Sequence, residues 1–123
     1  MLSSREASAG GLAYWRIHSR GYEKVTDPLS DIAIQRELGN LNGWARRGGA
    51  IVKAYQFKTF PEGIAFVNRV AAAAEAAEHH PDIDIRYTKI ICSLSTHDSG
   101  GITQKDLDLA KEMDSLEPAP RSV

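Results

Sequence analysis

The feature that most constrains this chain is one long amphipathic helix pattern placed between two hairpin patterns. Thr59-Phe60-Pro61-Glu62 is a capping box, with Thr59 as the cap, Glu62 three residues later and Pro61 in the first turn, where a helix tolerates it. Apolar residues then recur at helical spacing to about Glu78, and Pro81 ends the pattern. We expect the buried face to consist of Phe60, Ile64, Val67, Ala71 and Ala74, widened by Phe66, Val70 and Ala73.

Two pairs of strand patterns flank this helix. Residues 44–47 and 50–57 are separated by Gly48-Gly49, and residues 83–86 and 89–96 are separated by Tyr87-Thr88. Each pair predicts an antiparallel hairpin with a two-residue turn. The last strand alternates in character, because Ile90, Cys92 and Leu94 are apolar and two of the three residues between or after them are serines.

A shorter helix is predicted at each end of this central unit. The first runs from the cap Ser30 to about Leu38, and the last begins at the cap Thr103, with Asp106 three residues on. The element order is therefore α-β-β-α-β-β-α, which predicts an α+β domain: a four-stranded antiparallel sheet with three helices on one face. Because a single helical layer leaves the sheet edges and the other face uncovered, self-association is also expected.

Length and composition limit what this domain does. The chain has 123 residues, enough for one domain, and its single cysteine cannot form an internal disulfide. No apolar run approaches the length of a membrane span, which is about 20 residues. The net charge is −1, whereas proteins that bind nucleic acid through its phosphates need an excess of basic residues. We expect a cytoplasmic protein with no membrane partner and no direct nucleic-acid partner. Residues 1–27 read as a poorly ordered leader, 28–117 as the domain and 118–123 as a short tail.

The compositional oddity is a cluster of histidines: His79, His80 and His97 fall within 19 residues. The surrounding residues 71–117 carry 10 acidic and 4 basic side chains, a setting that favours protonated imidazole and disfavours phosphate. Helical periodicity places Glu75 and His79 on one border of the helix, aimed at the same place. His97 follows a strand, so the helix end and the strand end can meet around one pocket.

Such imidazoles suit acid/base chemistry. With an unperturbed pKa of about 6.5, one histidine can donate a proton while another accepts one. Glu75 and Asp106 would then orient the rings. Two alternatives stay open: the histidines are structural or surface groups, or Glu75, His79 and His97 bind zinc. Against zinc, His79 and His80 point about 100° apart on a helix, and no further His or Cys spacing completes a site.

One set of motifs resembles a known family. Glu78-His79-His80-Pro81-Asp82-Ile83 is followed by Tyr87, then by Leu94-Ser95-Thr96-His97-Asp98 and Gly100-Gly101-Ile102-Thr103. With these motifs, residues 30–116 closely resemble the pterin-4α-carbinolamine dehydratases. The resemblance implies a hydro-lyase that dehydrates 4a-hydroxytetrahydropterin to quinonoid dihydropterin during tetrahydrobiopterin recycling, with no metal and no redox cofactor.

The resemblance also implies roles for individual residues. His79 and His97 would be the acid/base pair, and His80 would help to bind the pterin and steady developing positive charge. Glu75 and Asp106 would be supporting carboxylates. The substrate site would be lined by the three histidines with Pro81, Thr96 and Asp98. Relatives imply a homodimer or homotetramer. The alternative from another class is a non-catalytic dimerisation or coactivator-type module, because in animals the same fold partners a homeodomain transcription factor.

Overall fold

The computed structural model describes residues 27–118. The predicted leader (1–27) and tail (118–123) therefore lie almost entirely outside the described residues. The elements are α3 (Asp31–Leu38), β1 (Ala45–Arg47), β2 (Ala50–Gln56), α4 (Phe60–Ala77), β3 (Asp82–Arg86), β4 (Lys89–Leu94), the short 3₁₀ helix η1 (His97–Ser99) and α5 (Gln104–Leu116). The predicted order α-β-β-α-β-β-α is confirmed, with η1 as an addition.

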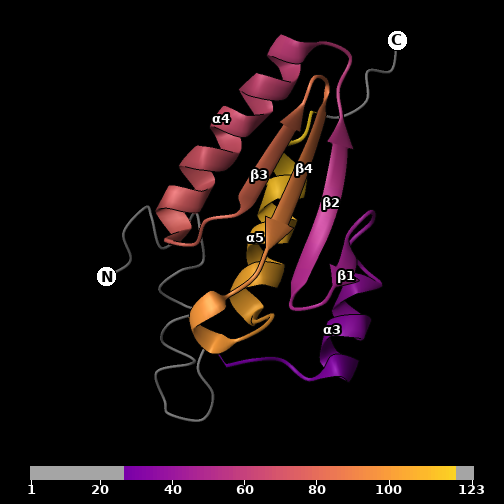
Figure 1. Ribbon diagram of the computed structural model, residues 1–123, viewed down its shortest axis with the longest axis vertical. Helices are drawn as coiled ribbons and strands as arrows, with labels where there is room; N and C mark the ends of the chain where they lie inside the picture. Colours follow the sequence, from indigo (N-terminus) through magenta and orange to yellow (C-terminus); the bar gives the residue numbers. More distant parts are fainter. Residues whose placement is uncertain (1–26, 119–123) are drawn as a thin grey trace.

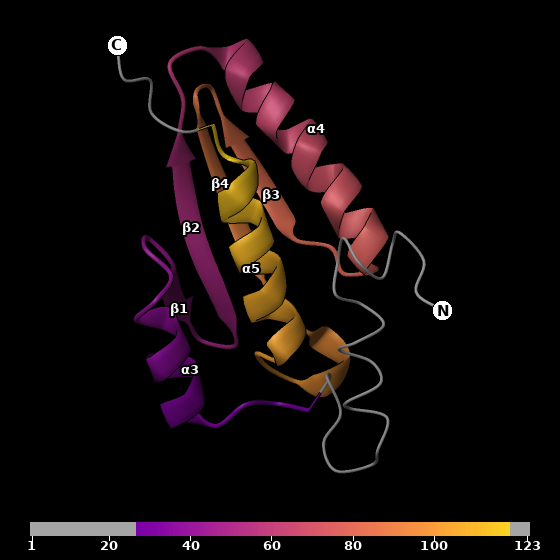
Figure 2. The same ribbon diagram turned by 180° about the vertical axis from the view of Figure 1, so that it is seen from behind.

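The four strands form one antiparallel sheet in the order β1-β2-β4-β3. The two predicted hairpins are joined through β2 and β4, where Ile51 pairs with Leu94 and Tyr55 with Ile90. Figure 2 shows α5 lying over the sheet with α4 beside it, and Figure 1 shows the same sheet from the opposite side. The alternation predicted for the last strand is confirmed, because Ile90, Cys92 and Leu94 are fully buried.

The predicted caps set the helix boundaries. The Ser30 hydroxyl accepts the N–H of Ala33 at 3.1 Å, and the Thr59 hydroxyl accepts the N–H of Glu62 at 3.2 Å. Thr103 and Asp106 form a complete capping box at the start of α5. These bonds satisfy backbone donors that would otherwise lack partners in the first turn of each helix.

The buried face of α4 differs from the predicted one. Its buried residues are Gly63, Phe66, Val70, Ala73 and Ala74, whereas Phe60 is 44% exposed and Ala71 is exposed. The helix is thus rotated so that the residues expected to widen the face lie at its centre. Two contacts explain this rotation. The centroids of the Phe66 and Tyr55 rings lie 4.5 Å apart. A Cβ on Gly63 would lie 3.4 Å from Ile90 Cδ1, so the helix approaches the sheet closely at this glycine.

Near the C-terminal end of α5, the Asp114 side chain connects the helix to β2 and to the segment before β1 through hydrogen bonds. Its Oδ1 atom accepts three hydrogen bonds, from Trp44 Nε1 at 3.1 Å, Lys53 Nζ at 3.0 Å and the Tyr55 hydroxyl at 2.6 Å. Burial, reinforced by the bond to Asp114, raises the pKa of Tyr55 far above its usual range. The phenol therefore stays a donor at any pH at which the protein is handled.

Replacing Asp114 with Ala is expected to lower the free energy of unfolding by about 1–3 kcal/mol, because three donors lose their shared acceptor. The side chain of Asp114 is 26% exposed, so water replaces part of what is lost. Urea denaturation measures the change. Asp108→Ala is the matched control, since Asp108 is an exposed residue of the same helix that bonds Gln104. Equal losses in the two variants would contradict this account.

Candidate active site

The end of α4 directs the two adjacent histidines to different surroundings. Glu78 adopts the left-handed conformation with φ 54°, and the N–H of His79 returns to the carbonyl of Ala74 at 3.1 Å. This turn takes the chain off the helical path before the histidines. As a result His79 is buried, with 8% of its surface exposed, while His80 is exposed.

The predicted pairing of Glu75 with His79 is wrong. Glu75 Oε1 instead lies 2.7 Å from His80 Nε2, and both side chains are exposed. The prediction assumed helical spacing through residue 79, and the left-handed Glu78 breaks that spacing. Because the Glu75–His80 pair is solvated, it adds little to stability and leaves the His80 ring accessible to a ligand.

His79 pairs with Asp106, the residue that also caps α5. His79 Nε2 lies 2.5 Å from Asp106 Oδ1, and Asp106 is fully buried. The other oxygen, Oδ2, accepts the N–H of Thr103 at 2.9 Å and the hydroxyl of Thr96 at 2.9 Å. Because a carboxylate only accepts hydrogen bonds, this pairing assigns the hydrogen to His79 Nε2 and leaves Nδ1 outside the pair.

The segment after β4 carries His97. The Thr96 N–H donates to the Gly101 carbonyl at 3.0 Å, and Gly100 adopts φ +77°, which closes a tight turn around η1. The Ser95 hydroxyl lies 3.5 Å from His97 Nε2. The turn thus holds the exposed His97 ring beside the end of β4.

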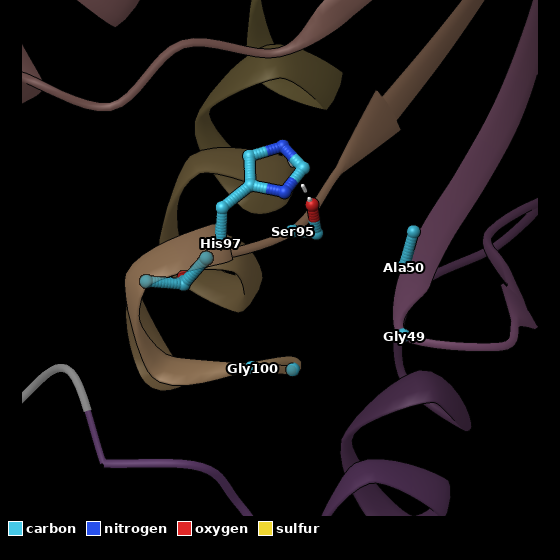
Figure 3. Close-up of a pocket in the computed structure, with 7 residues that line it drawn as sticks. Gly49, Ala50, Ser95, His97 and Gly100 are labelled. Carbon is cyan, nitrogen blue, oxygen red and sulfur yellow. Dashed lines mark hydrogen bonds between the residues drawn. The ribbon is translucent and has the colours of Figure 1, made fainter.

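A pocket of about 350 Å³ opens next to His97. Its lining residues are Gly49, Ala50, Ser95, Thr96, His97, Gly100 and Gly101. Figure 3 shows the His97 ring and Ser95 on one side and Gly49 and Ala50, at the start of β2, on the other. Most of these side chains are small, so the pocket offers a histidine, a serine hydroxyl and accessible backbone to a ligand.

The structure therefore divides the predicted substrate-binding residues into two groups. Thr96 and His97 line the pocket, whereas His79, His80, Pro81 and Asp98 do not. The helix end and the strand end were expected to meet around one pocket, but they meet instead through the buried Asp106, which contacts both His79 and Thr96.

Five lining residues were absent from the predicted site: Gly49, Ala50, Ser95, Gly100 and Gly101. Gly49 lies in the β1–β2 turn and Ala50 begins β2, and the sequence analysis interpreted this hairpin only as part of the fold. A Cβ on Gly49 would lie 3.9 Å from Gly101 Cα, so the two glycine-containing turns face each other. Their small size was the available signal, but only the pairing of β2 with β4 shows that they lie opposite His97.

Within residues 27–118, no group of three or more His, Cys, Asp or Glu side chains is arranged to hold a metal ion. Glu75 and His79, on which the zinc alternative depended, bind different partners. The Cys92 thiol lies in the core, and burial raises its pKa to about 12, so the thiol stays protonated near neutral pH. In the same range, no helix is long and apolar enough to cross a membrane.

The fold and the site together define a class: a small α+β domain in which carboxylate–histidine pairs and a histidine-bearing pocket are suited to proton transfer. Residues 27–116 match the family model described as pterin 4 alpha carbinolamine dehydratase. The chain belongs to this family of dehydratases, and the resemblance found in its motifs is confirmed.

Individual relatives agree with this assignment. A protein of Roseiflexus sp. (strain RS-1) is 57% identical over 88 residues, covering 72% of this chain and 95% of its own length. One of Koribacter versatilis (strain Ellin345) is 49% identical over 94 residues, covering 76% and 100%. Both carry the name "Putative pterin-4-alpha-carbinolamine dehydratase".

Two solved structures share the fold. A transcriptional coactivator/pterin dehydratase from Brucella melitensis superposes with a TM-score of 0.72 at 28% identity, covering 75% of this chain and all of its own. A pterin dehydratase-like protein described as a RuBisCO assembly factor in the alpha-carboxysome has a TM-score of 0.52 at 20% identity, covering 63% and 89%. The second likeness concerns the fold alone.

Proposed function

We propose that this chain dehydrates 4a-hydroxytetrahydropterin to quinonoid dihydropterin and water by histidine acid/base catalysis. The observation that carries the proposal is the buried hydrogen-bond network from His79 through Asp106 to Thr96, next to the pocket that bears His97. Family membership supplies the substrate class, and the network supplies an oriented imidazole.

The reaction needs two proton transfers and no change of redox state. The bond between C4a and the hydroxyl oxygen breaks, and an acid protonates that oxygen so that it leaves as water. The N5 lone pair forms the C4a=N5 double bond, and a base removes the N5 proton. One general acid and one general base, each with a pKa near the pH at which the enzyme works, are therefore sufficient for this reaction.

We assign the acid/base pair to His79 and His97. The Asp106 carboxylate fixes the ring of His79 and directs its Nδ1 to proton transfer. The exposed ring of His97 stands at the pocket. The accessible His80, held by Glu75, would contact the pterin and the positive charge that develops on it, with Pro81 and Asp98 completing the surroundings.

The pocket itself is open to a direct test. Ala50→Leu adds three heavy atoms opposite His97, and this is expected to raise KM for the carbinolamine about 10-fold by occupying space the pterin needs. Steady-state kinetics with varied substrate measures the change. Ala54→Leu, an exposed position on the same strand, is the control and should leave KM unaltered. An unchanged KM in Ala50→Leu would place the substrate elsewhere.

The wider setting of the proposal is tetrahydrobiopterin recycling in the cytoplasm, by a homodimer or homotetramer formed by the domain of residues 28–117. The alternative, a coactivator-type interaction module, gains some weight from the name of the Brucella melitensis structure. The intact His79–Asp106 pair favours catalysis, because a module without a reaction has no need of a buried, oriented imidazole.

The experiment is a stopped-flow measurement of carbinolamine dehydration at several enzyme concentrations. The proposal predicts an observed rate that rises linearly with enzyme above the spontaneous rate. A rate equal to the spontaneous one at every concentration would reject it in favour of the interaction module.

A further inference from the structure

Thr96 lines the pocket, and its hydroxyl is engaged in the buried network with Asp106 and Thr103. We propose that Thr96 is a positioning residue: its hydroxyl holds the Asp106 carboxylate in the orientation that presents Oδ1 to His79. The catalytic consequence rests on the proposed function, whereas the hydrogen-bond arrangement does not.

The direction of each hydrogen bond follows from the donors present. The Thr96 hydroxyl donates its single hydrogen to Asp106 Oδ2 at 2.9 Å. Thr96 Oγ1 also lies 2.8 Å from Thr103 Oγ1, so Thr103 must be the donor in that bond. The Thr103 oxygen in turn accepts the N–H of Lys105 at 3.2 Å. Thr96 is 7% exposed and has no hydrogen left to offer a pterin.

These hydrogen bonds determine the orientation of the Asp106 carboxylate. Two donors, the Thr96 hydroxyl and the Thr103 N–H, hold Oδ2, which leaves Oδ1 for His79. The Thr103 N–H is part of the capping box and would be satisfied in any helix with this cap. The Thr96 hydroxyl is the additional donor, so we assign the orientation of the carboxylate toward His79 to it.

Thr96 is itself firmly held. Its N–H donates to Gly101, and its carbonyl accepts the N–H groups of Ser99 and Gly100 at 3.0 and 3.1 Å. One residue thus anchors the turn that carries His97 through its backbone and positions His79 through its side chain. The two proposed proton-transfer groups are coupled at this point of the fold.

The test compares Thr96→Val, which keeps the shape and removes the hydroxyl, with Thr96→Ser, which keeps the hydroxyl. We expect Thr96→Val to lower kcat about 10-fold with KM changed by less than about 2-fold, and Thr96→Ser to restore kcat. Proton NMR of the His79 Nε2–H is the second readout. Its signal should weaken through faster exchange in Thr96→Val and persist in Thr96→Ser.

Thr88→Val is the matched control, because the Thr88 hydroxyl accepts a hydrogen bond from Gln56 Nε2 at 2.6 Å in a hairpin turn outside the network. It should change neither readout. If Thr96→Val does not fold, Thr96→Cys replaces it, since a thiol is a weaker donor and the losses should be partial.

Two results would overturn the inference. An unchanged His79 signal together with normal kcat in Thr96→Val would show that the hydroxyl positions nothing. An unchanged signal with a raised KM would return Thr96 to the role of a substrate contact. If wild type does not accelerate dehydration at all, the proposed function fails, and the NMR comparison alone still decides whether Thr96 orients the pair.

Discussion

His79→Ala and His97→Ala are each expected to lower kcat for carbinolamine dehydration by a factor of about 10² or more, the usual contribution of a positioned acid or base. His79 is oriented by a buried carboxylate, and His97 lines the pocket. Each substitution therefore removes a different proton-transfer group. Stopped-flow kinetics at saturating substrate measures both losses.

His80→Ala is the matched comparison for these variants, because it removes an adjacent imidazole that is exposed and paired with an exposed carboxylate. We expect its effect to fall mainly on KM, in keeping with a substrate contact. Wild-type kcat in both His79→Ala and His97→Ala would contradict the assignment. A kcat loss in His80→Ala that exceeds both would move the catalytic role to His80.

Asp106→Ala is expected to cost about 2–5 kcal/mol in the free energy of unfolding, more than the other replacements considered for stability. The carboxylate is fully buried, and its removal leaves the Thr103 N–H, the Thr96 hydroxyl and the His79 ring without their acceptor. The helix also loses half of its capping box. Urea denaturation measures the loss, with Asp108→Ala as an exposed control two residues along the same helix.

Asp106→Asn separates stability from catalysis. The amide has nearly the same shape, but one of its two ends is a donor, so it must face either the donors of Thr96 and Thr103 or the ring N–H of His79. We expect kcat to fall about 10-fold or more in the fraction that remains folded. Full stability and full kcat in Asp106→Asn would show that the charge of this carboxylate has no role.

The parts of the fold that sequence predicted well are those governed by local chemistry. Ser30, Thr59 and Thr103 cap helices because their hydroxyls reach nearby N–H groups, and this is a short-range property. The alternation of Ile90, Cys92 and Leu94 follows from the period of a strand. The motif that contains the histidines was sufficient to place the chain in its family.

The parts that were missed depend on conformation or on contacts distant in sequence. Glu78 adopts a left-handed conformation that is uncommon outside glycine, and the chain beyond it brings His79 to Asp106 and His80 to Glu75. The place of Ala50 in the pocket follows from the pairing of β2 with β4, which neither hairpin pattern specifies. The rotation of α4 depends on the packing of Phe66, whereas the pattern allowed two adjacent faces.

The most direct test of the central claim compares wild type with the double variant His79→Ala/His97→Ala in one stopped-flow experiment on 4a-hydroxytetrahydropterin. Circular dichroism of both proteins first establishes that the double variant is folded. The account predicts that wild type dehydrates the carbinolamine well above the spontaneous rate and that the double variant does so at the spontaneous rate. A folded double variant that retains the wild-type rate, or a wild-type rate no faster than the spontaneous one, would contradict it.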